Sequence, residues 1–292
     1  MAGIPGLVKP LVEAPPVAAL RYGVFAAARV TEITDPEQQA RLWGSGYSYI
    51  TDHCGGAVAY DDTCAAQPAK TFVEGSDLIE GDPFRVMATK QCGSVGRTAA
   101  EMEQAVRQQL ASGEQSVVEA VMWDGSTLAA HTPTLTGSGA TALVPAAPGA
   151  GAAIAELEES GYDVFGYQGV IHVNTAAYAA LAYSNLVVRD GAVLRTPLGT
   201  RLSFGPGYGT TGPDDLAAPA GFVWAFMTSM VDIRRTPVFV PPMNEVFDRT
   251  GNQWMAEAIR AYAFTWDCPE VFAVLVPVAA PAVATAPAVP GP

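Results

Sequence analysis

The sequence predicts an α+β fold built around one long helix, with strands before and after it. Residues 98–125 (TAAEMEQAVRQQLASGEQSVVEAVMWDG) have apolar residues at helical spacing, whereas short β-branched and aromatic runs bounded by Gly, Asp and Pro lie on either side. Hydrophobic residues make up 49% of the 292-residue chain, which is enough for a sizeable core. The length allows one large domain or two smaller ones.

The composition limits the classes of function. The chain has 29 acidic and 16 basic residues, a net charge of −13 at pH 7, and lysine only at positions 9, 70 and 90. Such a charge repels the phosphate backbone of nucleic acids, so a reader of nucleic acid sequence is not expected. Charged residues amount to only 15%. A surface this poor in charge favours oligomerisation, which buries apolar surface.

The amino-terminal region, residues 1–44, is predicted to be an extended arm. It mixes proline, glycine and short apolar runs, and its prolines at positions 5, 10, 15 and 16 would break an apolar helix. It has no basic start, so we expect neither an export signal nor a membrane span, and synthesis in a cytoplasm. At the other end, the Ala/Pro/Val-rich residues 279–292 are expected to form a flexible tail.

Residues 45–92 are expected to form an extended loop ahead of the helix. Turn residues alternate there with short β-prone runs, of which KTFV (70–73) and PFRVMAT (83–89) are the clearest. The pattern predicts a long hairpin-like excursion.

The helix has a clear start. Thr98 and Glu101 fit a capping box, in which each side chain accepts a hydrogen bond from the other residue's backbone N–H. At 1.5 Å per residue the helix would be roughly 40 Å long. Its apolar stripe comprises Met102, Val106, Leu110, Val117 and Val121, and the remaining surface carries Glu101, Glu103, Arg107, Glu114 and Glu119.

Gly113 falls on the apolar stripe of this helix. A glycine there costs about 1 kcal/mol of helix propensity relative to alanine. Close packing of another backbone against it would compensate. The competing interpretation is two helices broken at SGE (112–114), and we favour a continuous or slightly kinked helix.

The rest of the chain is predicted to mix helices and strands. The expected elements are a short helix at AIAELEES (153–160) closed by Gly161, a buried strand at GVIHVN (169–174), a helix at 175–184, a hairpin with its turn at Asp190-Gly191, and one long strand at 221–235. Residues 252–268 allow a helix or a strand. We favour a strand, because alternate residues from Trp254 to Trp266 share a face, and VFAVLVPV (271–278) follows as another strand.

This order of elements resembles the major capsid proteins of tailed phages, the Hong Kong 97-like shell fold that encapsulins share. The stretches that carry the resemblance are DPFRVMATKQCG, EQAVRQQLASGEQSVVEAVMWDG, GVIHVN, RTPLGTRLSFGPGYGTTGP and AEAIRAYAFTWDC, and the layout covers about residues 41–277. The resemblance implies an arm (1–44), an extended loop (45–92), a peripheral domain with the spine helix (93–136), an axial domain (137–231), returning peripheral strands (232–278) and the tail (279–292).

The resemblance also implies a function: self-assembly into the icosahedral head of a phage that encloses the DNA genome. The expected partners are copies of the chain in hexamers and pentamers, with portal, scaffold and decoration proteins as further candidates. The acidic chain would enclose DNA without sequence-specific binding. No membrane partner, cofactor, metal or catalytic residue is expected, and the protein would be located in the virion after assembly in the host cytoplasm. The alternatives are a tail tube or decoration protein, an encapsulin shell, and a Cys/His-dependent enzyme.

Some members of the family form a covalent cross-link between a lysine in the loop and an asparagine. Lys70 lies well inside the expected loop, and Asn244 and Asn252 are candidate partners. Nothing in the local sequence distinguishes these residues, so we expect Lys70 to be an ordinary exposed lysine.

Few residues are candidates for chemistry. Asp52-His53-Cys54, with Cys64 and Cys92 nearby, would suit a zinc site or a Cys/His nucleophile pair. No C-x-x-C pair is present, so we expect buried cysteines or at most a Cys54–Cys64 disulfide.

The remaining histidines and acidic residues also favour structural roles. His172, in an apolar strand, is expected to be a core histidine, and His131 lies in a Thr/Pro-rich stretch. Glu114 and Glu119 are five residues apart and are not expected to form a carboxylate pair. No Glu-x-x-His motif indicates a di-iron site, and GPGYGTTGPDD (205–215) matches no phosphate-binding loop.

Overall fold

The computed structural model of the chain describes residues 18, 20–51, 54, 78–93, 98–126, 128, 133–137, 139–242, 247–248 and 253–278. The strand expected at 70–73 and the tail at 279–292 lie outside these residues. Among the described residues, no helix combines the length and apolar character that a membrane crossing requires.

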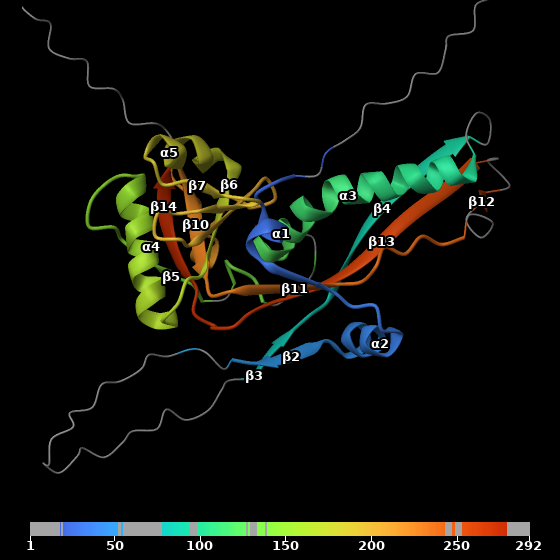
Figure 1. Ribbon diagram of the computed structural model, residues 1–292, viewed down its shortest axis with the longest axis horizontal. Helices are drawn as coiled ribbons and strands as arrows, with labels where there is room; N and C mark the ends of the chain where they lie inside the picture. Colours follow the sequence, from blue (N-terminus) through green and yellow to red (C-terminus); the bar gives the residue numbers. More distant parts are fainter. Residues whose placement is uncertain are drawn as a thin grey trace, which may run out of the picture.

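The chain forms two lobes, each with its own sheet and helices (Figure 1). In the α3 lobe, the long helix α3 (Ala99–Asp124) packs on a five-stranded sheet. This sheet comprises β1 (Arg29–Glu32), β11 (Val231–Arg235), β13 (Gln253–Trp266), β12 (Phe247–Asp248) and β4 (Phe84–Gly93), with β11, β12 and β4 all paired to β13.

In the α4 lobe, α4 (Ala150–Phe165) packs on a seven-stranded sheet, and α5 (Tyr178–Tyr183) contacts α4. The strands, in spatial order, are β5 (Thr141–Ala142), β14 (Phe272–Pro277), β10 (Phe222–Thr228), β6 (Val170–Asn174), β9 (Arg201–Gly205), β8 (Val193–Arg195) and β7 (Val188–Asp190). The remaining elements are α1 (Val24–Ala27), α2 (Pro36–Ser45), the hairpin β2 (Tyr47–Ile50) and β3 (Leu78–Gly81), and the 3₁₀ turns Thr175–Ala177 and Pro213–Asp215.

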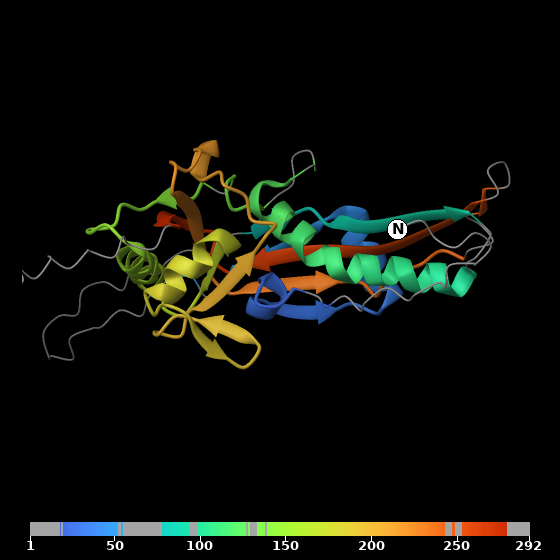
Figure 2. The same ribbon diagram turned by 90° about the horizontal axis from the view of Figure 1, so that it is seen from above.

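The predicted long helix is confirmed. The Thr98 side chain accepts from Glu101 N–H at 3.3 Å, and the Glu101 carboxylate accepts from Thr98 N–H at 2.7 Å, so the capping box is complete. The helix is continuous through Gly113 and ends where Gly125 takes a left-handed conformation, φ 81°. The alternative of two helices broken at residues 112–114 is therefore wrong. Figure 2 shows α3 running alongside β4 and β13.

The apolar stripe of this helix differs from the prediction at Val117 and at Gly113. The buried stripe continues at Val118, which is fully buried, and Val117 is 42% exposed. Nothing lies within 4 Å of the position that a side-chain carbon on Gly113 would occupy, so no neighbouring backbone packs closely against this glycine.

The open space beside Gly113 leads to a prediction. Gly113→Ala should raise the free energy of unfolding by about 0.5–1 kcal/mol, because alanine restricts the unfolded chain and meets no atom in the fold. Gly207→Ala is the matched control with the opposite sign, since its Cβ would collide with the backbone oxygen of Ser116 on α3. Urea unfolding of the unassembled chain measures both. A destabilising Gly113→Ala would contradict the open position.

The segment 221–235, predicted as one strand, forms two strands in different sheets. The chain leaves the seven-stranded sheet after β10 at Thr228 and enters the five-stranded sheet as β11 at Val231. The strand at VFAVLVPV is predicted to be one of the returning peripheral strands, whereas β14 pairs with β10 in the α4 lobe. The chain thus crosses between the sheets at residues 229–230 and again at 267–271. The local pattern could not reveal these crossings, because the residues on both sides of each one are β-prone.

Other elements differ in extent from the prediction. The helix α4 runs from Ala150 through Gly161 to Phe165, because Gly161 meets the Met227 side chain of the sheet beneath it and the chain turns only at Gly166, φ 73°. In the expected arm, α2 is a helix capped by Asp35, whose carboxylate accepts from Glu37 N–H at 3.1 Å. The arm is therefore not wholly extended.

Each lobe has a hydrophobic core. One core packs α1 and α3 against β4, β11 and β13 and extends onto β6, β10 and β14 of the seven-stranded sheet. The other core packs α4 and α5 against the seven-stranded sheet. The strand prediction for residues 252–268 is confirmed, because Ala256, Ala258, Tyr262 and Phe264 of β13 are all buried in the first core. Val24 and Ala27 of α1 are fully buried there too, so this part of the amino-terminal region belongs to the core of its own chain.

Candidate functional site

Many of the residues singled out in the sequence lie outside the described part of the chain. These are Asp52, His53, Cys64, Lys70, His131, Asn244 and Asn252. The candidate Lys–Asn cross-link and any metal or nucleophile site that uses His53 therefore remain predictions. Cys92 pairs through its backbone with Trp254 of β13.

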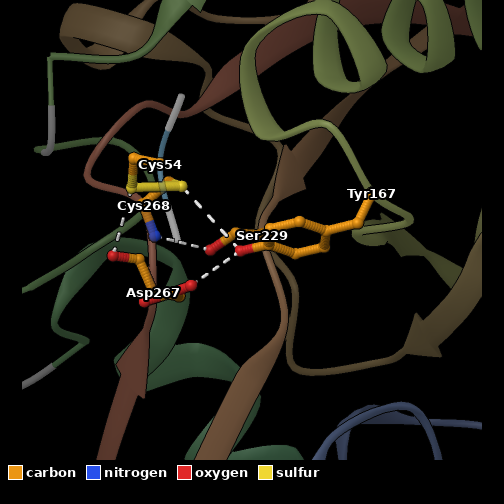
Figure 3. The surroundings of a disulfide bond; sticks show 5 residues. All are labelled: Cys54, Tyr167, Ser229, Asp267 and Cys268. Atoms are coloured by element: carbon orange, nitrogen blue, oxygen red, sulfur yellow. Dashed lines mark hydrogen bonds between the residues drawn. A yellow bond between two sulfur atoms is a disulfide. The ribbon is translucent and has the colours of Figure 1, made fainter. Parts of the chain in front are cut away.

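Cys54 forms a disulfide with Cys268, which corrects the expected Cys54–Cys64 pairing (Figure 3). The two Cα atoms are 5.3 Å apart although 214 residues separate the cysteines in sequence. Cys54 follows β2 and is exposed, whereas Cys268 lies in the crossing between β13 and β14 and is fully buried. Spacing alone could not identify this pair, since only the fold brings residue 54 beside residue 268.

The same cysteines belong to a group of potential metal ligands. Their sulfur atoms and a carboxylate oxygen of Glu270 lie within 4.8 Å of one another. Zinc binds thiolates, and sulfurs joined in a disulfide are not thiolates. The oxidised pair is therefore a cross-link and not a ligand set.

His172 is a core histidine, as predicted. It is fully buried in β6, with Nδ1 2.9 Å from the Tyr208 hydroxyl and Nε2 3.0 Å from the Thr228 hydroxyl. Burial lowers the pKa of its imidazole to about 3, so the ring is neutral at physiological pH. Both ring nitrogens are engaged within the core, so His172 ties three segments of the α4 lobe together.

Glu114 lies at the centre of a buried ionic network, although its sequence pattern placed it on the polar surface of the helix. Its carboxylate accepts from Arg260 Nη1 at 3.1 Å and from the Tyr262 hydroxyl at 2.6 Å. Burial raises the pKa of Tyr262, and the nearby Glu114 charge raises it further, so the hydroxyl stays protonated and donates. Arg235 lies 4.0 Å from Glu114. The network fastens α3 to β11 and β13.

Glu119, also expected on the polar surface, is fully buried between α3, α1 and the segment after β9. Its carboxylate accepts from Val24 N–H at 3.1 Å and from Gly207 N–H at 3.3 Å. Burial raises the pKa of this carboxyl to about 7, and the two backbone N–H groups act against the rise. Side chains at Gly23 and Gly205 would collide with this carboxylate. Glu119 therefore joins the amino-terminal region and the α4 lobe to the long helix.

Helical spacing could have indicated that Glu114 and Glu119 are buried. Glu114 is four residues after Leu110 and four before Val118, both buried, so it lies within the apolar stripe. Glu119 lies one turn before Trp123, which is fully buried. An acidic residue in the middle of an apolar stripe is typical of a buried, partnered charge.

A cavity of about 640 Å³ lies between α1, α3 and the β7–β8 turn. Its polar lining includes Arg21, Arg189, Arg235 and Glu114, and no His or Cys lines it among the described residues. Arg189 stacks over the Tyr22 ring at 5.5 Å.

Exposed apolar side chains gather on the face of the five-stranded sheet that points away from α3. We call Met87, Phe239, Met255 and Ile259 the outer sheet face. Met87 of β4 and Phe239 both pair with Ile259 of β13, and Met255 follows on the same side of that strand. Met87, Phe239 and Met255 are 57%, 60% and 46% exposed. A row of exposed apolar residues on a sheet indicates a surface that another chain covers.

The fold is that of phage capsid proteins. The chain is similar to the capsid of an empty GTA particle (14% identity, TM-score 0.55, covering 92% of this chain and 95% of that one). It is also similar to a chain from the phage G structure of major capsid and decoration proteins (11% identity, TM-score 0.55, 94% and 99% covered). A third similar structure is from Mycobacterium phage Adephagia (14% identity, TM-score 0.52, 92% and 94% covered). The sequence matches no protein-family model and no curated protein.

Proposed function

We propose that this chain is the major capsid protein of a tailed phage, which self-assembles into hexamers and pentamers of an icosahedral head around the DNA genome. The observation that carries this proposal is the extent of the structural similarity. It covers 92% of this chain and 95% of the chain from the GTA capsid, so it extends over both lobes.

The division into parts follows from the same proposal. Residues 1–44 are the arm, 45–92 the extended loop, 93–136 the spine-helix part of the peripheral domain, and 137–231 the axial domain. Residues 232–278 return to the peripheral domain, with β14 completing the axial sheet, and 279–292 are the tail. The core packed by α4 and α5 supports an axial domain, and the other core continues from α3 onto β10 across the proposed boundary.

Assembly would bury the apolar surface that the single chain exposes. The outer sheet face offers Met87, Phe239 and Met255, and the β2–β3 hairpin offers Ile50 and Leu78, which are 54% and 63% exposed. Repeated by symmetry, such contacts supply the interface area that a stable shell requires. In this proposal the β2–β3 hairpin of one subunit covers the outer sheet face of the next.

The proposal assigns no turnover to the chain, and no cofactor or metal. The shell would enclose DNA without reading its sequence, since the net charge of −13 repels phosphate. Portal, scaffold and decoration proteins are proposed as further partners. The assembled protein would be located in the virion after assembly in the host cytoplasm.

Negative-stain microscopy of the purified full chain tests the proposal. Closed shells, or hexamers and pentamers, are the expected result. Tubes would indicate a tail protein, and a monomer at high concentration with no assembly in the presence of its phage's scaffold would overturn the proposal.

The outer sheet face gives a sharper test. Phe239→Ser should abolish or greatly slow shell formation, because it removes the most exposed apolar side chain of that face, while the folded subunit loses little. Val144→Ser is the matched control, since Val144 is 86% exposed near β5 in the other lobe. Light scattering follows assembly, and circular dichroism checks folding. Equal assembly of both variants and the wild type would show that this face is not an interface.

A further inference from the structure

The Cys54–Cys268 pair lies where the two lobes meet. Cys268 is in the crossing from β13 to β14, and its backbone N–H donates to the Ser229 hydroxyl at 2.8 Å in the other crossing, between β10 and β11. Cys54 comes from a different part of the chain, four residues after the end of β2 at Ile50. A bond between the two cysteines therefore joins the β2–β3 hairpin to both crossings.

The surroundings hold the buried cysteine in position. The Tyr167 hydroxyl donates to Asp267 at 2.9 Å and lies 3.8 Å from Sγ of Cys268 (Figure 3). The Cα–Cα separation of 5.3 Å is within the usual range of about 4.4–6.8 Å for disulfides. The backbone separation in the bonded state is therefore that of an ordinary disulfide.

The exposure of the two cysteines differs, and this sets the order of reaction. Cys54 is exposed, so a dissolved reagent meets it first, whereas Cys268 is fully buried. A reducing cytoplasm keeps such pairs as thiols, and oxidising surroundings close them.

We propose that Cys54 and Cys268 form a redox-controlled staple, open as two thiols in reducing surroundings and closed by an organic disulfide such as oxidised glutathione. When closed, it fastens the loop end of the β2–β3 hairpin, next to Ile50, to the junction of the two lobes. The chemistry of the pair does not depend on the shell function, and only its effect on particles rests on that proposed function.

The reaction is a thiol–disulfide exchange in two steps. The Cys54 thiolate attacks one sulfur of the organic disulfide, which releases one thiolate and leaves a mixed disulfide on Cys54. The Cys268 thiolate then attacks Sγ of Cys54 and displaces the second thiolate. Two electrons pass from the cysteines to the organic disulfide, and the two released thiolates take up the two protons that the cysteines lose, which gives two thiols.

Peptide mapping tests the staple directly. The full chain, purified with its thiols reduced, is treated with oxidised glutathione, alkylated and digested without reduction. We expect a Cys54–Cys268 linked peptide in wild type and in the matched controls Cys64→Ser and Cys92→Ser, and its loss in Cys54→Ser. A Cys54–Cys64 peptide, links between chains or fully alkylated cysteines would overturn the proposal. Stoichiometric zinc in the reduced protein would do so too, because Glu270 and the two thiols would then be a metal site.

Heat stability gives the second readout. Closing a loop of 214 residues should raise the Tm of the oxidised chain by on the order of 10 °C over the reduced chain. Cys54→Ser, at an exposed position that leaves the core intact, should match the reduced wild type with or without oxidant. The same comparison on assembled particles reports on the shell, so a failed assembly does not affect the result on the subunit. Equal Tm values for oxidised and reduced wild type would show that the bond stabilises nothing.

Discussion

Replacing Glu114 by alanine is expected to lower the free energy of unfolding by about 3 kcal/mol. The change leaves the guanidinium of Arg260, whose side chain is only 12% exposed, without its closest carboxylate. It also removes the acceptor of the Tyr262 hydroxyl. Breaking one side of a buried ion pair costs about 3–5 kcal/mol in general. The lower end applies because Glu32 remains 3.7 Å from Arg260.

Urea unfolding of the unassembled chain measures this change. Glu103→Ala is the matched control on the same helix. It removes a carboxylate that is paired with Arg107, and both side chains of this pair are exposed. Exposed pairs contribute at most about 1 kcal/mol. Equal effects of the two substitutions would show that the Glu114 network is no stronger than a surface ion pair.

The second large effect is a dependence of stability on pH through Glu119. Its pKa is raised from 4.5 to about 7 in the fold, so between these values the folded chain binds a proton that the unfolded chain does not. The contribution to the free energy of unfolding is therefore largest below pH 4.5 and falls by about 3 kcal/mol as the pH rises through 7. Protonated Glu119 suits the buried junction of α1, α3 and β9 better than the charged form.

The difference between wild type and Glu119→Gln isolates this effect. His172 contributes a slope of the opposite sign, because its pKa is lowered from 6.5 to about 3 and acid must charge a buried ring. That slope is common to both proteins and cancels in the difference. The wild-type advantage should shrink by about 3 kcal/mol between pH 4.5 and pH 7.5. Parallel profiles over this range would contradict the raised pKa of Glu119.

Much of the fold could be predicted because its signals are local. The capping box of Thr98 and Glu101, the strand at GVIHVN and the hairpin turn at Asp190-Gly191 all appear where the sequence indicated. Each signal depends on side chains within a few residues of the backbone that they stabilise.

The outer sheet face could not be predicted from the sequence, because its contacts join residues that are distant in the chain. The outer sheet face combines Met87, Phe239 and Ile259, which come together only when β4 and the segment at Phe239 pair with β13. An exposed methionine and phenylalanine carry no mark in the sequence that separates them from core residues.

The sequence by itself determined the α+β class, the long helix from its cap to Gly125, and the strand character of β13. These features depend on helical and alternating periodicities, which are patterns of residues close together in the chain. Only the tertiary structure decided which groups Glu114 and Glu119 bind, because their partners Arg260, Val24 and Gly207 come from other elements. Only the tertiary structure decided, too, that the chain passes from one sheet to the other at residues 229–230 and that Cys54 pairs with Cys268. A contact across 214 residues depends on how the sheets pack, and no local pattern encodes it.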